Sequence, residues 1–240
     1  NRRLRPVAEP VEYEDRVANV LCPLLAAHDV LLDLHSFRTP GQPFVMRGPP
    51  DNDGPLEPFR HAAAEGRLAV HLGATRVVDG WLDVYAAGVA ARRARAPAAD
   101  PLQQDVAYGV GLAEYMRASG GYGVTLECGQ HADPRAPEIA RRAIRNALAL
   151  LGLVDEPVEP PAGPVECLTL TEVFDRHDAG DRFERAWASF DAVREGELVA
   201  QRADGTELRA PSDGYVVFPD VGAQPGHEWF YFARPGDRRP

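Results

Sequence analysis

Two stretches of the chain carry apolar residues at every third or fourth position, which predicts amphipathic helices over residues 11–29 and 137–153. A proline at position 137 suits the first turn of the second helix. The residues expected to face the core are Val17, Val20, Leu21, Leu24 and Leu25 in the first helix, and Ala140, Ile144, Ala147, Leu148 and Leu151 in the second. Further helices are predicted near residues 57–72 and over residues 100–121, the latter stopped by paired glycines.

Two short apolar runs, "VLLDLHSF" (30–37) and "YGVTLECG" (122–129), read as buried strands. Strands that alternate with helices predict an α/β fold with a mixed, mostly parallel sheet and helices on both faces. The Pro- and Gly-rich stretch 38–55 is too irregular for a core element, so we expect a loop that lies over a site.

The composition changes after the helix predicted over 137–153. We predict an α/β domain over residues 1–155, a proline-rich linker over 156–163 and a small all-β domain over 164–240. The strand-like runs in the last part are "ELVAQR", "TELRAP", "GYVVFP" and "WFYFAR".

Charge and residue usage exclude several classes of function. The net charge of −10 argues against nucleic acid as a partner, because phosphate binding needs a basic surface. No run is apolar enough to predict a membrane span, and three widely spaced cysteines suit a reducing compartment, so a cytoplasmic location is expected. The chain has no lysine, which excludes a GKT phosphate loop, a Schiff base and a lipoyl attachment site.

The chemistry-bearing residues stand at the ends of the two predicted strands. Asp33 and His35 are two residues apart and therefore point to one face of their strand, and Glu127 stands near the end of the other. In open α/β sheets, ligands bind beyond the carboxyl ends of the strands, so His35 and Glu127 could face one crevice. An imidazole can bind zinc and a nearby carboxylate can take a proton from water, but a lone strand-end histidine is more often a satisfied core or rim residue.

Taken in order, "NRRLRP", "LLDLHS", "TLECGQH" and "PGHEWFYFAR" resemble the succinylglutamate desuccinylase/aspartoacylase family, a zinc carboxypeptidase-like group. This resemblance implies a zinc carboxypeptidase-like fold and one Zn²⁺ ion. It implies that His35 is a zinc ligand and that Asn1 and Arg2 hold a substrate carboxylate. It also implies that Glu127 is the general base toward the attacking water and then the general acid toward the leaving amine.

One motif of that family is missing from this sequence. Members carry an upstream His-x-x-Glu that supplies two more zinc ligands, and no histidine here is followed by glutamate three residues later. Because catalytic zinc normally takes three protein ligands, we expect two further ligands upstream of Asn1. We also expect the 240 residues alone to be inactive and to lack the first strand of the sheet.

Other polar residues have both a functional and an ordinary interpretation. Asp33 could orient a metal ligand or satisfy a nearby loop, and His131 could line the pocket or lie in a solvated loop. Cys128 should point away from Glu127, which argues against a thiol nucleophile. Three arginines could bind an anionic substrate or simply be surface charges: Arg38, Arg47 and Arg117.

The sequence thus favours a zinc-dependent amide hydrolase that removes the acyl group from an N-acylated amino acid or a similar small carboxylate. Two alternatives stay open. One is a carboxypeptidase-like peptidase that acts on short peptides; the other is a non-catalytic protein that binds small carboxylates and has lost its zinc site. We expect a small-molecule partner, neither nucleic acid nor membrane, and homo-oligomers are a further possibility that the relatives suggest.

Overall fold

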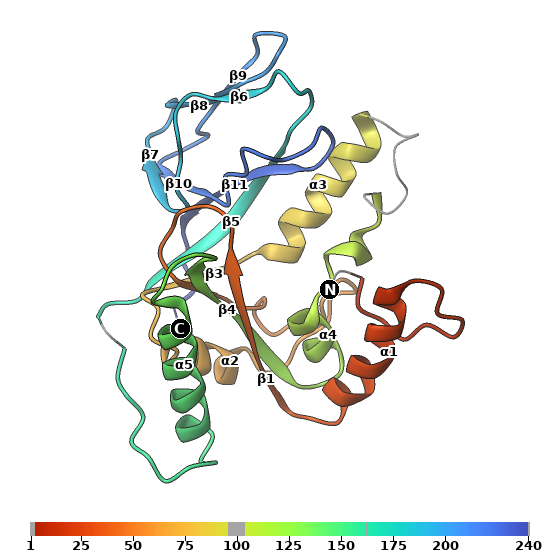
Figure 1. Ribbon diagram of the computed structural model, residues 1–240, viewed down its shortest axis with the longest axis vertical. Helices are drawn as coiled ribbons and strands as arrows, with labels where there is room; N and C mark the ends of the chain where they lie inside the picture. The colour runs from red at the N-terminus through yellow and green to blue at the C-terminus, as the bar shows by residue number, and fades with distance from the viewer. Residues whose placement is uncertain (1–2, 96–103, 162, 240) are drawn as a thin grey trace.

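A computed structural model of the chain describes residues 3–95, 104–161 and 163–239 (Figure 1). Its helices are α1 (Tyr13–Ala26), α2 (Ala62–Val70), α3 (Trp81–Arg95), the 3-10 helix η2 (Val106–Gly109), α4 (Leu112–Ala118) and α5 (Ala136–Leu150). Its strands are β1 (Val30–Phe37), β2 (Phe44–Met46), β3 (Arg76–Asp79), β4 (Tyr122–Gln130), β5 (Glu166–Asp175), β6 (Arg182–Phe183), β7 (Asp191–Val193), β8 (Leu198–Gln201), β9 (Glu207–Arg209), β10 (Gly214–Val217) and β11 (Glu228–Pro235).

An eight-stranded sheet runs through the molecule in the order β1-β4-β2-β3-β5-β11-β10-β7. Among its first five strands, the pairs β1–β4, β2–β3 and β3–β5 are parallel, and only β2–β4 is antiparallel. The remaining pairs, β5–β11, β11–β10 and β10–β7, are all antiparallel. The predicted mixed, mostly parallel sheet is therefore confirmed for the part that the helices cover.

Helices cover both faces of the β1–β4 region, as Figure 1 shows, with α5 and α2 on one side and α1 and α4 on the other. Side chains of β4 alternate between these layers: Val124, Leu126 and Cys128 pack in the core with α2 and α5. Thr125 and Glu127 point to the opposite face. The prediction that Cys128 points away from Glu127 is confirmed.

The predicted apolar face of α1 is wrong in part. Val20 and Leu24 are exposed, because the helix packs on α4 and β1 through the narrower stripe Ala18, Cys22 and Leu25. Two of these three side chains, Ala18 and Cys22, are small and lie about one helical turn apart.

The predicted face of α5 needs a similar correction. Ile144 is exposed, and Ala143 and Asn146 are buried in its place. The Asn146 amide is satisfied there by the carbonyl oxygen of His71 at 2.6 Å, which explains how a polar residue occupies a core position.

The helix predicted over residues 100–121 is broken in the described part of the chain into η2 and α4. Gly109 ends the first segment, and a Cβ at this position would lie 2.5 Å from the ring of Tyr85 on α3. Gly111 then precedes α4 in an extended conformation, and its N–H donates to Glu114 at 2.9 Å. The two glycines thus produce a bend that helical spacing alone does not reveal.

The stretch 38–55 contains a core strand, which corrects the expectation of an irregular loop. Phe44 and Val45 are fully buried and place β2 between β3 and β4. The apolar triplet at Phe44–Met46 is long enough to pair on both sides despite the prolines around it.

The chain after the linker is mostly β-structure, as predicted. Its first strand, β5, pairs with β3 on one side and with β11 on the other, so the sheet continues into this part without a break. A second sheet, β6-β8-β9, packs there around an aromatic core that includes Trp229 and Phe230. The proposed division at residues 156–163 stays a prediction. Within the described residues, no helix is long and apolar enough to cross a bilayer.

Candidate active site

The parallel pairing of β1 with β4 brings the predicted site residues together. His35 lies directly opposite Glu127 in the register, and Asp33 lies opposite Thr125. All four side chains line one cavity of about 470 Å³ at the carboxyl ends of these strands. The spatial expectation drawn from the two sequence motifs is thus met by the geometry.

The imidazole of His35 lies between two carboxylates. Its Nε2 is 3.1 Å from Oδ2 of Asp33, and its Nδ1 is 3.9 Å from Oε1 of Glu127. The first distance is a hydrogen bond, which fixes the ring and raises the pKa of His35, although burial of the ring acts in the opposite direction. When the imidazole is neutral and Nε2 carries the proton, the lone pair of Nδ1 faces Glu127.

Glu127 is a buried carboxylate whose hydrogen-bonding capacity is not used up. Its side chain is only 9% exposed, and Oε2 has no hydrogen-bond partner among the described residues. Burial raises the pKa of Glu127 to about 7, with the nearby His35 lowering it and Asp33 adding to the rise. A carboxyl group with a pKa near neutrality can both accept and return a proton, as acid–base catalysis requires.

The cavity walls come from distant parts of the chain. One wall comes from the β2–α3 segment, with Arg47 directly after β2 and Trp81 at the start of α3. A second wall comes from α4, with Glu114 and Arg117. The β10–β11 side supplies the rest: Phe218, Asp220, Glu228 and Tyr231. The ring of Trp81 packs against Tyr231 with centroids 5.5 Å apart, which joins two of these walls.

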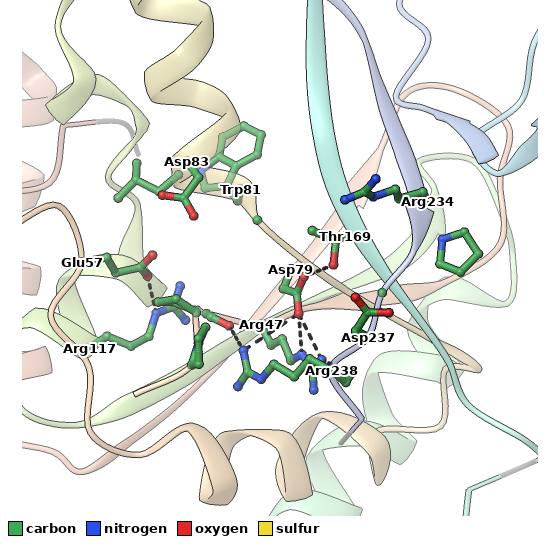
Figure 2. Close-up of a pocket in the computed structure, with 17 residues that line it drawn as sticks. Arg47, Glu57, Asp79, Trp81, Asp83, Arg117, Thr169, Arg234, Asp237 and Arg238 are labelled. Carbon is green, nitrogen blue, oxygen red and sulfur yellow. Dashed lines mark hydrogen bonds and ion pairs between the residues drawn. The ribbon is translucent and has the colours of Figure 1, made fainter. Parts of the chain in front are cut away.

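Arg47 is engaged by neighbouring groups in an adjacent cavity of about 320 Å³ (Figure 2). Its Nη2 donates to Asp79 at 3.0 Å and to the carbonyl of Arg238 at 2.7 Å, and its side chain is 1% exposed. The carboxylate of Asp79 also accepts from Thr169 at 2.7 Å. Arg47 therefore forms a buried ion pair with Asp79 at the border of both cavities. The interpretation of Arg47 as an ordinary surface charge is wrong.

Arg117 is buried among three carboxylates. It donates to Glu57 at 2.5 Å, to Glu65 at 3.2 Å and to Glu114 at 2.9 Å (the first of these is drawn in Figure 2). Burial raises the pKa of Glu57 to about 7, and the guanidinium of Arg117 lowers it only in part. The third arginine singled out from the sequence, Arg38, is exposed and lies 3.7 Å from Asp220.

The other candidates lie at or beyond the edge of the site. His131 is exposed and hydrogen-bonded to Ser36 at 2.8 Å, so it belongs to the rim loop. Asn1 and Arg2, which the resemblance assigns to a substrate carboxylate, lie outside the described residues.

Sequence reasoning missed the walls built by Trp81, Asp220, Glu228 and Tyr231. The short run "RVVDG" does show the apolar-then-acidic pattern of a strand end, so Asp79, and Trp81 two residues later, could have been found by the rule applied to Asp33. The contributions of the β10–β11 side depend on long-range pairing and carry no local signal.

The donor set of this cavity is incomplete for a zinc site. Residues 3–95, 104–161 and 163–239 contain no group of three or more His, Cys, Asp or Glu side chains arranged to hold a metal ion. His35 offers one nitrogen toward Glu127, whereas a catalytic zinc ion needs three protein ligands and an open position. The described residues therefore supply at most one part of such a site.

Comparison with known proteins finds relatives by structure but none by sequence. No protein-family model matches the chain, and no curated protein matches it. Solved structures with the same fold include the ectoine utilization protein EutE (DoeB) from Ruegeria pomeroyi, in a product-bound structure, with 20% identity and a TM-score of 0.67 over 97% of this chain and 66% of that one. A succinylglutamate desuccinylase/aspartoacylase from Rhodobacter sphaeroides has 17% identity and a TM-score of 0.68 over 99% and 68% of the two chains.

A succinylglutamate desuccinylase from Vibrio cholerae is similar to the same degree, with 17% identity and a TM-score of 0.65 over 98% of this chain and 64% of that one. The chain thus spans about two thirds of the length of these structures. The resemblance to the succinylglutamate desuccinylase/aspartoacylase family is confirmed at the level of the fold.

Proposed function

We propose that this chain forms part of an amide hydrolase that removes the acyl group from an N-acylated amino acid or a similar small carboxylate. The observation that carries the proposal is the Glu127 carboxylate, which is buried, incompletely hydrogen-bonded and close to His35 in a cavity at the strand ends. Burying an ionised carboxylate costs free energy unless a partner compensates its charge, and incompletely paired buried acids cluster at functional sites. The fold relatives also carry deacylase names.

Glu127 would transfer the protons of the reaction. It first takes a proton from the attacking water, while the water oxygen bonds to the amide carbon. It then gives that proton to the amine nitrogen as the carbon–nitrogen bond breaks, which leaves a carboxylic acid product and a free amine. A pKa of about 7 suits both steps, because the group exchanges protons readily near neutral pH.

Asp33 would act through His35 rather than on the substrate. Its hydrogen bond to Nε2 holds the ring so that Nδ1 faces the cavity. We propose His35 as one ligand of a single Zn²⁺ ion, with Asn1 and Arg2 as the anchor for the substrate carboxylate and with the two remaining zinc ligands upstream of Asn1. Zinc in that position would polarise the amide carbonyl and lower the pKa of water. The described residues do not complete its ligand set, so the steps above are assigned to Glu127 alone.

The test is metal analysis of the purified full-length protein together with a panel of N-acyl amino acids. We expect about one zinc ion per chain, release of the free acid from acyl amino acids, and loss of release after chelation. Release of a C-terminal amino acid from short peptides would favour the peptidase instead. A protein without zinc that hydrolyses no member of either panel would favour the small-carboxylate binder and overturn the proposal.

A further inference from the structure

The loop between β2 and α2 packs against α4 and the start of β4 through three side chains. Phe59 is 1% exposed, and the guanidinium of Arg117 lies 5.8 Å from the centre of its ring. Nε2 of His61 is 3.1 Å from a backbone carbonyl oxygen in the turn before β4. The carboxylate of Glu57 accepts a hydrogen bond from Nε of Arg117 at 2.5 Å, as Figure 2 shows. Residues 49–61 belong to no helix or strand, so the position of this loop depends on such contacts.

Three largely buried carboxylates share Arg117, and Glu57 has the fewest hydrogen-bond donors among them. Glu65 accepts two backbone N–H bonds in addition to the guanidinium, at 2.5 and 3.1 Å. Glu114 accepts one more, at 2.9 Å. Glu57 has Arg117 as its one donor within the described residues, although its side chain is only 10% exposed. Because hydrogen bonds to the ionised form keep a buried carboxyl charged, Glu57 is the one of the three that is best placed to hold a proton.

The charge balance around Arg117 also favours a neutral Glu57. Three carboxylates face one guanidinium, and like charges that share a site disfavour the ionisation of one of them. The rest of the cavity of about 320 Å³ contributes six more charged side chains: Arg47, Asp79, Asp83, Arg234, Asp237 and Arg238. Arg47 and Arg238 lie beside Asp79, and the other three are exposed to water. Within the part of the chain that the structure describes, none of the six makes a hydrogen bond or an ion pair with Glu57.

The other ionisable groups of the loop are engaged elsewhere. Asp51 accepts a hydrogen bond from the first backbone N–H of α2 at 2.9 Å, and Asp53 pairs with the exposed Arg60. The ring of His61 faces the backbone carbonyl before β4. Among the ionisable groups of residues 49–61, Glu57 is therefore the one whose charge meets a buried cluster of charges.

The position of the loop decides how firmly Glu57 binds a proton. When the loop is docked, burial raises the pKa of Glu57 to about 7; the guanidinium of Arg117 opposes this rise, and Glu114 and Glu65 add to it. In water, the pKa of the same carboxyl would return to its ordinary value of 4.5. The stabilisation of the docked loop by this proton is therefore fully present below pH 4.5 and is lost as pH rises through about 7.

We propose that Glu57 is a pH-dependent latch: it is neutral and docked on Arg117 in mildly acidic solution, and as pH rises it loses its proton to water and the loop 49–61 is released. Arg117 lines both the active-site cavity and the smaller cavity, and Pro49, Pro50 and Glu57 line the smaller one. Release of the loop would open a wall of the smaller cavity and remove one of the three carboxylates that hold Arg117. The inference is independent of the proposed amide hydrolysis, because this contact takes no part in the proposed chemistry.

Two backbone N–H groups report on the docking of the loop. Those of Asn52 and Phe59 each donate to the carbonyl of the other residue, at 2.9 and 3.0 Å. Such a pair of bonds is not stable in isolation, so both amides should exchange with water when the loop leaves the protein.

The test is amide hydrogen exchange of the full-length protein at pH 5, 6 and 7, corrected for the intrinsic exchange rate at each pH. We expect the protection of these two amides to fall by at least about tenfold from pH 5 to pH 7, while the amides of β4 keep theirs. Protection of the loop that stays constant over this range would overturn the inference.

Two variants with the same chemical change show whether Glu57 is the titrating group. Glu57→Gln keeps an oxygen that accepts from Arg117 but cannot ionise, so the loop's protection should change by less than about twofold between pH 5 and pH 7. Asp53→Asn, at an exposed position of the same loop, should keep the tenfold change of the parent. A Glu57→Gln protein with the parent's pH dependence would assign the titration to another group, such as His61, and would overturn the inference.

A titration of the unsubstituted protein tests the same point without changing the fold. Carbon-13 NMR follows the carboxyl carbon of Glu57, identified by its absence from the spectrum of Glu57→Gln. A midpoint clearly above 4.5 supports the latch, and a midpoint at or below 4.5 overturns it. Neither measurement requires turnover or zinc, so both decide the inference even if no acyl amino acid is hydrolysed.

Discussion

Glu127 at the strand ends and Asp181 in the β-rich part are both buried carboxylates, and their surroundings differ in one respect. Asp181 accepts hydrogen bonds from Arg202 at 2.8 Å and from three backbone N–H groups, those of His177, Asp178 and Ala203. Glu127 has the imidazole of His35 at 3.9 Å and an oxygen atom with no partner in the described part of the chain.

The two pKa values separate accordingly. Burial acts to raise both, but the guanidinium and backbone donors around Asp181 outweigh it and lower that pKa to about 2. At Glu127, burial prevails and raises the pKa to about 7. Partners, more than depth, therefore decide whether a buried acid stabilises the fold or keeps its capacity for chemistry.

The largest expected effect comes from Glu127→Gln. The amide keeps the shape of the side chain but cannot take a proton from water, so we expect kcat for deacylation to fall by about 10³-fold. The measurement is steady-state hydrolysis of the best acyl substrate by the full-length protein. Thermal or urea unfolding of the same variant should show stability within about 1 kcal/mol of the parent, because no described partner of Oε2 is lost. Full activity in this variant would contradict the assignment of Glu127.

Asp181→Asn should do the reverse. The substitution leaves the guanidinium of Arg202, which is 9% exposed, without its counter-charge, and we expect a loss of about 3 kcal/mol in the free energy of unfolding with little change in kcat. Urea titration measures it. A matched control is Asp204→Asn on the exposed turn nearby, where the same chemical change should have a much smaller effect on stability. Equal losses in the two variants would show that the buried pair contributes little.

The lowered pKa of Asp181 also predicts that part of the free energy of unfolding is lost in acid. Its pKa in the folded protein, about 2, lies below the ordinary value of 3.8, so its contribution is fully present above pH 3.8 and is lost as pH falls through 2. This amounts to about 2 kcal/mol. Urea unfolding of the parent and of Asp181→Asn at pH 5, 3 and 2 should show their difference shrinking toward acid pH by that amount. A difference that stays constant between pH 5 and pH 2 would contradict the lowered pKa.

The pairing of His35 with Glu127 could be predicted from the sequence because each residue stands at the end of an apolar run, and parallel strands end at the same edge of a sheet. Period-two alternation likewise predicts that Asp33 shares a face with His35, and the two side chains lie 3.1 Å apart. These features depend on local patterns in two short segments.

The β10–β11 wall and Asp181 could not be predicted in the same way. Asp220 and Glu228 reach the cavity because β11 pairs with β5, which lies far from them along the chain. Asp181 meets Arg202 because the end of β8 returns to the β5–β6 loop, which no local spacing reveals. The prediction of the buried face of α1 was wrong in part for a related reason. The neighbour that α1 packs against decides which of its apolar residues are buried.

Asp33→Asn has the smallest expected effect and tests how the two carboxylates beside His35 divide their tasks. Asp33 holds Nε2 of the ring, and an asparagine oxygen accepts the same hydrogen bond without the charge that makes the imidazole a stronger donor of electrons. We expect zinc affinity of the full-length protein to fall about tenfold, measured by competition with a chelator. The control Asp29→Asn, on the exposed turn before β1, should leave affinity unchanged.

Proton–nitrogen NMR of His35 gives a readout independent of turnover: the proton should reside on Nε2 in the parent and be shared between both ring nitrogens in the variant. An unchanged tautomer together with unchanged affinity would mean that Asp33 serves only the local loop, and Glu127 alone of the two carboxylates would then keep its proposed role in the chemistry.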